Sequence, residues 1–140
     1  MANIDKERIT LLISEVEKAL GILIDYSGMN KEELLGDLKS LGSMKYYFII
    51  AIEACIDICN HIAAKEHLGL PESYADCFKI LGDNGIVPKE LSNKLINMAK
   101  FRNLLVHLYW KVDDEKMYEI LQTELGDFEE FVRYISRRYL

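Results

Sequence analysis

Hydrophobic residues recur every three or four positions along most of this chain. Between Asn3 and Tyr26 this spacing predicts a helix, because side chains three and four residues apart lie on one face of an α-helix. Ser27 and Gly28 are expected to end that helix. Its predicted apolar face consists of Ile9, Leu12, Ile13, Val16, Leu20, Leu23 and Ile24.

A shorter helix is predicted next. Asn30 is followed three residues later by Glu33, a pattern typical of a capping box, and the helix is expected to run to about Leu38. Gly36 and Gly42 weaken this region, because glycine is a poor helix former. We therefore expect a break or a bent join at about residues 40–43.

The central element is predicted to be a long helix over residues 44–67. Its hydrophobic residues surround much of the helix circumference instead of forming one stripe, which is typical of a helix with neighbours on several sides. Gly69 and Pro71 are expected to end it.

Three further segments complete the predicted architecture. Residues 72–81 indicate a short helix, and Pro88 suits the first turn of a helix that runs to about residue 108 or 109. Asp113 and Asp114 are expected to cap a last helix through about residue 138, with Gly126 as a weak point. The predicted fold is an all-α, up-and-down bundle of five or six helices, four of them long, in a single domain spanning residues 1–140.

Composition and charge narrow the possible classes of protein. The formal net charge of −6 argues against broad, nonspecific coating of nucleic acid, although it leaves room for one small basic cleft. The longest uninterrupted apolar run, residues 46–52, has seven residues, so no membrane span is expected. The charged N-terminal segment does not suit a signal peptide. The three cysteines fit reduced thiols in a cytoplasmic protein.

The candidate chemistry lies in the segment RNLLVHLY, residues 102–109. His107 can move a proton near neutral pH, and Arg102 presents a permanently charged fork that suits phosphate. Together these side chains could cleave an RNA phosphodiester without a metal, with the 2′-hydroxyl as nucleophile and the arginine stabilising the transition state.

Helical geometry leaves several arrangements of this pair open. Five residues at about 100° each place Arg102 and His107 roughly 140° apart on an ideal helix, whereas Asn103 and His107 share a face. The arginine could swing back, the helix could loosen near its end, or two chains could pair and share their motifs. Alternatively, His107 is an interior structural histidine and Arg102 is a surface ion-pair partner.

A polar stripe on the central helix offers a partner for the motif. Glu53, Asp57 and His61 follow one another at steps of four, and a buried carboxylate requires a partner. Our hypothesis is that Glu53 or Asp57 orients Arg102 or His107; otherwise the stripe faces water or another subunit. No Glu-x-x-His pair of the kind used by metal-binding bundles occurs, so we expect no metal and no cofactor.

The segment RNLLVHLY resembles the R-x4–6-H-x-Y motif of HEPN domains, and in particular that of HepT-like ribonuclease toxins, the partners of minimal nucleotidyltransferase antitoxins. The resemblance extends to the central helix segment YFIIAIEACIDICNH, to Pro71-Glu72-Ser73-Tyr74, and to the spacing from Gly85-Ile86-Val87 to Met98. It covers most of the chain from about residue 30 onward.

This resemblance implies an all-α homodimer whose two motifs line a shared cleft. Arg102 and His107 would be the catalytic pair of a metal-independent endoribonuclease toxin acting on RNA. Tyr109 would be the tyrosine to which a nucleotidyltransferase antitoxin transfers AMP, and the added negative phosphate would repel RNA. Taken alone, Tyr109 also fits a tyrosine near a helix end that buries its ring and exposes its hydroxyl. Trp110 could stack on a base or simply pack.

Two other functional classes stay open at this point. One is a catalytically inactive HEPN module that binds a nucleotide or a nucleotidyltransferase. The other is an ordinary helical interaction protein in which His107 is structural.

Overall fold

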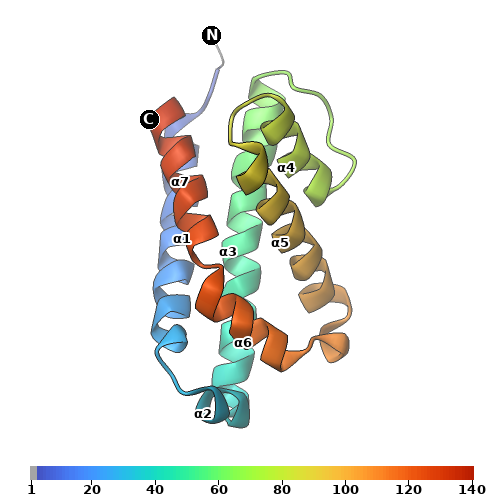
Figure 1. Ribbon diagram of the computed structural model, residues 1–140. Helices are drawn as coiled ribbons and strands as arrows, with labels where there is room; N and C mark the ends of the chain where they lie inside the picture. Colours follow the sequence, from blue (N-terminus) through green and yellow to red (C-terminus); the bar gives the residue numbers. More distant parts are fainter. Residues whose placement is uncertain (1–2) are drawn as a thin grey trace.

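The computed structural model describes residues 3–140, which form seven α-helices and one 3₁₀ turn and contain no β-strand (Figure 1). Met1 and Ala2, which begin the segment judged unsuited to a signal peptide, lie outside the described residues. The all-α prediction is confirmed, whereas the prediction of five or six helices is wrong. The elements are α1 (Lys6–Ser27), α2 (Lys31–Gly36), α3 (Leu38–Lys65), α4 (Tyr74–Asp83), α5 (Lys89–His107), η1 (Tyr109–Lys111), α6 (Asp114–Thr123) and α7 (Gly126–Tyr139).

Helix α3 is the centre of the bundle. It has 28 residues and contacts α1, α2, α4, α5 and α7, with α1 and α7 on one side of it and α4 and α5 on the other (Figure 1). Within the described residues it is the one helix long and apolar enough, by length and composition, to cross a membrane. More than half of its most apolar window is buried against the other helices, so its position in the core accounts for its hydrophobicity.

The start of α3 differs from the sequence-based expectation. No break occurs at residues 40–43, because α3 begins at Leu38 and continues through Gly42. Leu41 and Met44 are buried in the core, and the Ser40 hydroxyl donates a hydrogen bond to the Asp37 carboxylate before the first turn. Burial of these side chains therefore outweighs the low helix propensity of glycine.

The predicted last helix is two helices. Helix α6 ends at Thr123 and α7 begins at Gly126, with α6 crossing the bundle diagonally and α7 lying along α1 (Figure 1). Leu125 is buried at the junction, and the largely buried Asp127 side chain lies 3.7 Å from Lys94 of α5. A bend at the expected weak point, Gly126, thus lets both segments pack against the core.

A hydrogen bond and a tight packing contact hold α4 and α5 together. The buried Ser92 hydroxyl of α5 donates a 2.8 Å hydrogen bond to the backbone carbonyl of Phe78 in α4. A Cβ atom at Gly82 would lie only 2.5 Å from the Ser92 Oγ atom. Glycine is therefore required at position 82 by packing, and this contact fixes α4 on the helix that carries Arg102 and His107.

The cysteines are free and buried, as expected for reduced thiols. Cys55, Cys59 and Cys77 all lie in the hydrophobic core. Burial raises the pKa of the Cys55 and Cys59 thiols far above the usual range, so these groups stay protonated and inert in the native protein.

Candidate active site

The motif of residues 102–109 spans the end of α5 and the turn after it. Leu105 is buried and anchors the last turns of α5, which ends at His107. The helix was expected to continue to residue 108 or 109, but Leu108 leaves helical geometry and η1 follows. Tyr109 therefore lies beyond the helix, in a 3₁₀ turn that projects from the bundle.

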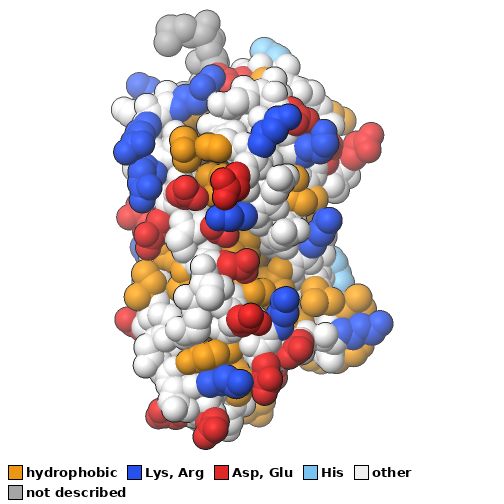
Figure 2. Space-filling view, in the orientation of Figure 1, with side chains coloured by type: hydrophobic (Ala, Val, Ile, Leu, Met, Phe, Trp, Pro, Cys, Tyr) orange, Lys and Arg blue, Asp and Glu red, His pale blue; other side chains and the backbone are white. Residues whose placement is uncertain are grey.

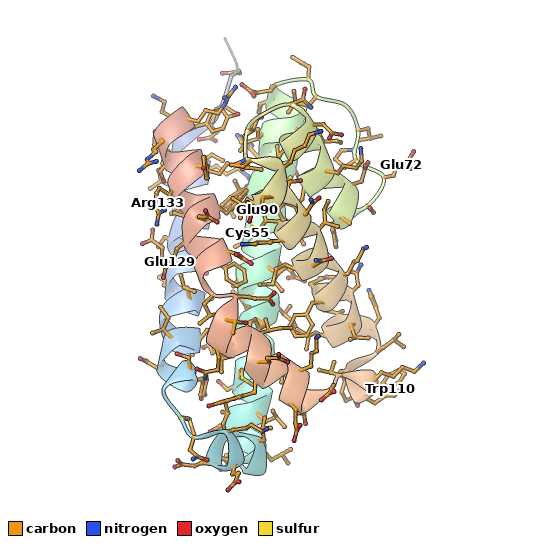
Figure 3. The ribbon with its side chains drawn as sticks, in the orientation of Figure 1. Cys55, Glu72, Glu90, Trp110, Glu129 and Arg133 are labelled. Atoms are coloured by element: carbon orange, nitrogen blue, oxygen red, sulfur yellow. The ribbon has the colours of Figure 1, made fainter. Side chains whose placement is uncertain are left out.

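Arg102 and His107 line the same cleft, which has a volume of about 560 Å³. They do so despite their separation of roughly 140° on an ideal helix, and the long Arg102 side chain reaches Glu53 of α3. Glu72, at the wall of this cleft, points outward on the side of the molecule formed by α4 and α5 (Figure 3). The cleft is lined by Asn60 of α3, by Pro71, Glu72, Ser73 and Tyr74, and by Arg102, Asn103 and His107 of α5.

The Arg102 guanidinium is held on several sides. Its Nε and Nη2 atoms donate hydrogen bonds of 3.0 and 2.6 Å to Glu53 Oε1, and Nη1 donates to Asn103 Oδ1 at 3.2 Å. Its Cζ atom lies 5.0 Å from the centroid of the Tyr74 ring. The Arg102 side chain is 12% exposed, whereas that of Glu53 is 39% exposed. This half of the motif is ordered and largely desolvated.

The guanidinium keeps free hydrogen-bonding capacity. Arginine has five N–H groups, and within residues 3–140 three of them have acceptors. One N–H on Nη1 and one on Nη2 are left without a protein acceptor in that part of the chain. Such a pair can bind two oxygens of a phosphate group.

The surroundings of His107 and Tyr109 are very different from those of Arg102. Both are exposed, Tyr109 to 62%, and within residues 3–140 neither side chain makes a hydrogen bond. Tyr109 packs edge-on against Trp110, with ring centroids 5.5 Å apart. Hydrophobic side chains gather at this projecting corner, and Trp110 points away from the bundle (Figures 2 and 3). Neither an interior histidine nor a tyrosine ring buried at a helix end agrees with this exposure.

The three polar residues of the α3 stripe differ in their contacts. Glu53 reaches Arg102, whereas Asp57 is exposed and makes no hydrogen bond to it. Partial burial and nearby Glu53 raise the pKa of Asp57, and Arg8 partly offsets this rise. His61 lies at the other end, where its Nε2 atom accepts a 3.1 Å hydrogen bond from the Asp5 backbone N–H.

No group of three or more histidine, cysteine, aspartate or glutamate side chains within residues 3–140 is arranged to hold a metal ion. Sequence reasoning assigned no role to Asn60 or Tyr74, although both line the cleft. Tyr74 belongs to the segment Pro71-Glu72-Ser73-Tyr74 that carried part of the resemblance. Its contact with Arg102 crosses between helices and left no periodic signal in the sequence.

Known proteins resemble this chain over most of its length. A family model described as "Ribonuclease HepT-like" matches residues 16–135. An mRNA nuclease HepT from Shewanella oneidensis is 40% identical over 84 residues, which are 60% of this chain and 63% of that protein. This match thus spans less than two thirds of the relative. A tRNA nuclease HepT from Aphanizomenon flos-aquae is 24% identical over 136 residues, 97% of this chain and 92% of that protein.

The fold is also shared with a solved toxin structure. The tri-AMPylated HEPN toxin of Shewanella oneidensis, solved in complex with its MNT antitoxin, superposes with a TM-score of 0.86. The two chains are 29% identical, and the match covers 93% of this chain and 97% of the toxin. The HEPN-like helical fold expected from the sequence is confirmed.

Proposed function

This chain belongs to the HepT-like ribonuclease family, and from that premise we propose that it is a metal-independent endoribonuclease toxin that cleaves RNA in the cytoplasm. One observation carries the proposal: Arg102 and His107, the two side chains suited to phosphodiester cleavage, line one cleft. Relatives named as mRNA and tRNA nucleases support RNA as the substrate.

In the proposed reaction the RNA supplies its own nucleophile. The 2′-hydroxyl loses its proton to a base and attacks the adjacent phosphorus, and the bond from phosphorus to the 5′-oxygen breaks. The products are a 2′,3′-cyclic phosphate and a 5′-hydroxyl, which receives a proton. His107 acts in proton transfer, and the free N–H groups of Arg102 bind the phosphate oxygens as negative charge builds up.

A homodimer completes this proposal. Cleavage requires both a base and an acid, and a second copy would bring a second His107 to a shared cleft. The exposure of His107 and of the apolar corner at Tyr109 and Trp110 supports an association surface next to the motif.

Tyr109 is proposed as the site of regulation by a nucleotidyltransferase-type antitoxin. Its hydroxyl would attack the α-phosphorus of ATP, form a tyrosyl–AMP bond and release pyrophosphate. The 62% exposure of Tyr109 gives a partner enzyme access, and the related toxin was solved in an AMPylated complex. The negative phosphate would then stand beside the cleft and repel RNA.

The proposal is tested by incubating unmodified protein with RNA in excess chelator. The protein is made without a nucleotidyltransferase, and its intact mass verifies that Tyr109 carries no AMP. We expect cleavage to 2′,3′-cyclic phosphate ends, and a loss of about 10²- to 10⁴-fold in His107→Ala.

A matched control is His67→Asn. His67 is exposed and lies outside the cleft, and asparagine tolerates its positive φ of 55°. This variant should keep full activity. If the unmodified wild type leaves RNA intact but gains mass at Tyr109 with ATP and a nucleotidyltransferase, the chain is an inactive HEPN binding module instead.

A further inference from the structure

Tyr74 lies face-on to the side chain proposed to bind the scissile phosphate. The Arg102 Cζ atom is 5.0 Å from the centroid of the Tyr74 ring, within the range of a cation–π contact. Tyr74 is 39% exposed and forms part of the cleft wall. Within residues 3–140 its hydroxyl makes no hydrogen bond, so the ring alone supplies the contact with Arg102.

Local structure fixes the position of this ring. Tyr74 is the first residue of α4, where the Ser73 hydroxyl accepts a 3.0 Å hydrogen bond from the Asp76 N–H. The Glu72 N–H in turn donates a 2.9 Å hydrogen bond to the Asp76 carboxylate. Because Gly82 and Ser92 lock α4 to α5, the ring and the guanidinium are carried by two helices with little freedom to slide.

The aromatic face supplies a restraint that Glu53 does not. Glu53 and Asn103 hold the guanidinium by its edges, through hydrogen bonds from Nε, Nη1 and Nη2. Because guanidinium N–H groups lie in the plane of the group, these bonds restrict movement mainly within that plane, and a second carboxylate added as a further restraint would repel a phosphate. A neutral ring attracts the cation, limits tilting of the guanidinium plane, and uses none of its N–H donors.

We propose that Tyr74 is a positioning residue for RNA cleavage, which holds the guanidinium plane of Arg102 in the orientation that receives the phosphate oxygens. This inference rests on the proposed function. Tyr74 acts through Arg102. Its replacement should therefore affect the transition state, where preorganised charge matters most, and not overall RNA binding.

The kinetic test compares Tyr74→Leu with Tyr74→Phe. Loss of the ring in Tyr74→Leu should lower kcat by roughly 3- to 30-fold, with KM changed less than twofold. Tyr74→Phe keeps the ring and should restore kcat to near the wild-type value. A wild-type kcat in Tyr74→Leu, an equal loss in both variants, or an increase in KM alone overturns the proposal. Circular dichroism and the thermal midpoint verify that both variants are folded.

A second measurement separates this inference from the proposed function. The exchange rate of the Arg102 Nε–H with water is followed by NMR in the wild type and in both Tyr74 variants. Faster exchange in Tyr74→Leu, with near-wild-type exchange in Tyr74→Phe, supports the positioning contact even if the wild type leaves RNA intact. Equal exchange in all three proteins overturns it, whatever the cleavage assay gives.

Discussion

Arg102 and His107 lie five residues apart on one helix, and their surroundings differ sharply. Arg102 is 12% exposed and contacts Glu53, Asn103 and Tyr74. His107 is exposed, and within residues 3–140 its side chain makes no hydrogen bond. The residue proposed to bind phosphate is thus held by contacts within one chain, whereas the residue proposed for proton transfer is left accessible to a substrate or a second copy.

The chemistry of the two side chains accounts for this difference. A guanidinium has five donors and stays charged, so three contacts can order it and still leave two N–H groups for a phosphate. Ordering a long arginine side chain in advance also removes an entropic cost from the reaction. An imidazole has only two nitrogen atoms, and a proton-transfer role requires at least one of them to be free.

After His107→Ala, the largest effect is expected from replacing Arg102. Arg102→Ala should lower kcat by about 10²- to 10³-fold, because a charge that stabilises the transition state is lost. The free energy of unfolding should change by less than about 1 kcal/mol, since Glu53 is 39% exposed and can be hydrated. Cleavage assays and urea unfolding measure the two quantities.

Arg102→Lys sharpens this test. Lysine keeps the charge but lacks the planar fork that meets Glu53, Asn103 and the Tyr74 ring together, so we expect it to restore little activity. Activity within about threefold of the wild type would mean that charge alone is required and that the contacts around the guanidinium have no catalytic role.

The next largest effect is expected at the lock between α4 and α5. Gly82→Ala places a Cβ atom 2.5 Å from Ser92 Oγ, so α4 must shift or Ser92 must lose its hydrogen bond to Phe78. We expect a loss of about 1–3 kcal/mol in the free energy of unfolding, typical of an overpacked site.

Gly21→Ala is the matched control for this substitution. Gly21 also lies inside a helix, but a Cβ atom there meets no neighbour within 4 Å. Alanine should stabilise the protein by about 0.5–1 kcal/mol through its higher helix propensity. Similar changes in both variants would show that the Gly82–Ser92 contact does not lock the two helices.

Glu53→Gln removes the negative charge beside Arg102 and preserves the shape of the side chain at position 53. The amide oxygen can still accept from Nε and Nη2, but hydrogen bonds without the negative charge are weaker, so kcat should fall by roughly fivefold. KM should fall as well, because a carboxylate that repels phosphate is gone. Steady-state kinetics on a short RNA separate these two parameters.

Glu72→Gln provides the comparison for Glu53→Gln. Glu72 lines the cleft, but within residues 3–140 it makes no hydrogen bond to Arg102. This variant should lower KM and leave kcat unchanged. The same fall in kcat in both variants would assign the effect to cleft charge in general and not to the orientation of Arg102.

Helical periodicity predicted much of this architecture correctly. The apolar circumference of residues 44–67 identified the central helix, and the caps at Asn30 and Asp113 mark the starts of α2 and α6. The predicted break at residues 40–43 failed because a local glycine signal says nothing about the burial of Leu41 and Met44. Helix termini follow local signals, whereas continuity through a weak position depends on tertiary packing.

The contacts of the candidate site were likewise only partly predictable from the sequence. The cost of burying a carboxylate was enough to suggest that Glu53 or Asp57 meets the motif, and Glu53 does contact Arg102. Choosing between the two required the relative rotation of α3 and α5, which no spacing within one helix encodes. The contact of Tyr74 with Arg102 depends on the path of the loop from α3 to α4, and so it emerges only from the folded chain.

The smallest effect is expected at Asp57, the carboxylate of the stripe that Arg102 does not contact. Partial desolvation and nearby Glu53 raise the pKa of this solvent-exposed carboxyl above the usual 3.8, so ionisation of Asp57 costs more free energy in the folded state than in the unfolded state. Asp57→Asn should therefore increase the free energy of unfolding at pH 7 by less than about 1 kcal/mol after solvent screening. The gain should shrink as the pH falls through the folded pKa toward 3.8, because the wild-type carboxyl then becomes neutral too. Urea unfolding at pH 7 and pH 4 measures this difference.

Because Asp57 makes no hydrogen bond to Arg102, kcat should be unchanged in Asp57→Asn. A fall in kcat of more than about threefold would show that Asp57 helps to orient the motif, and Glu53 would then no longer be distinct from it.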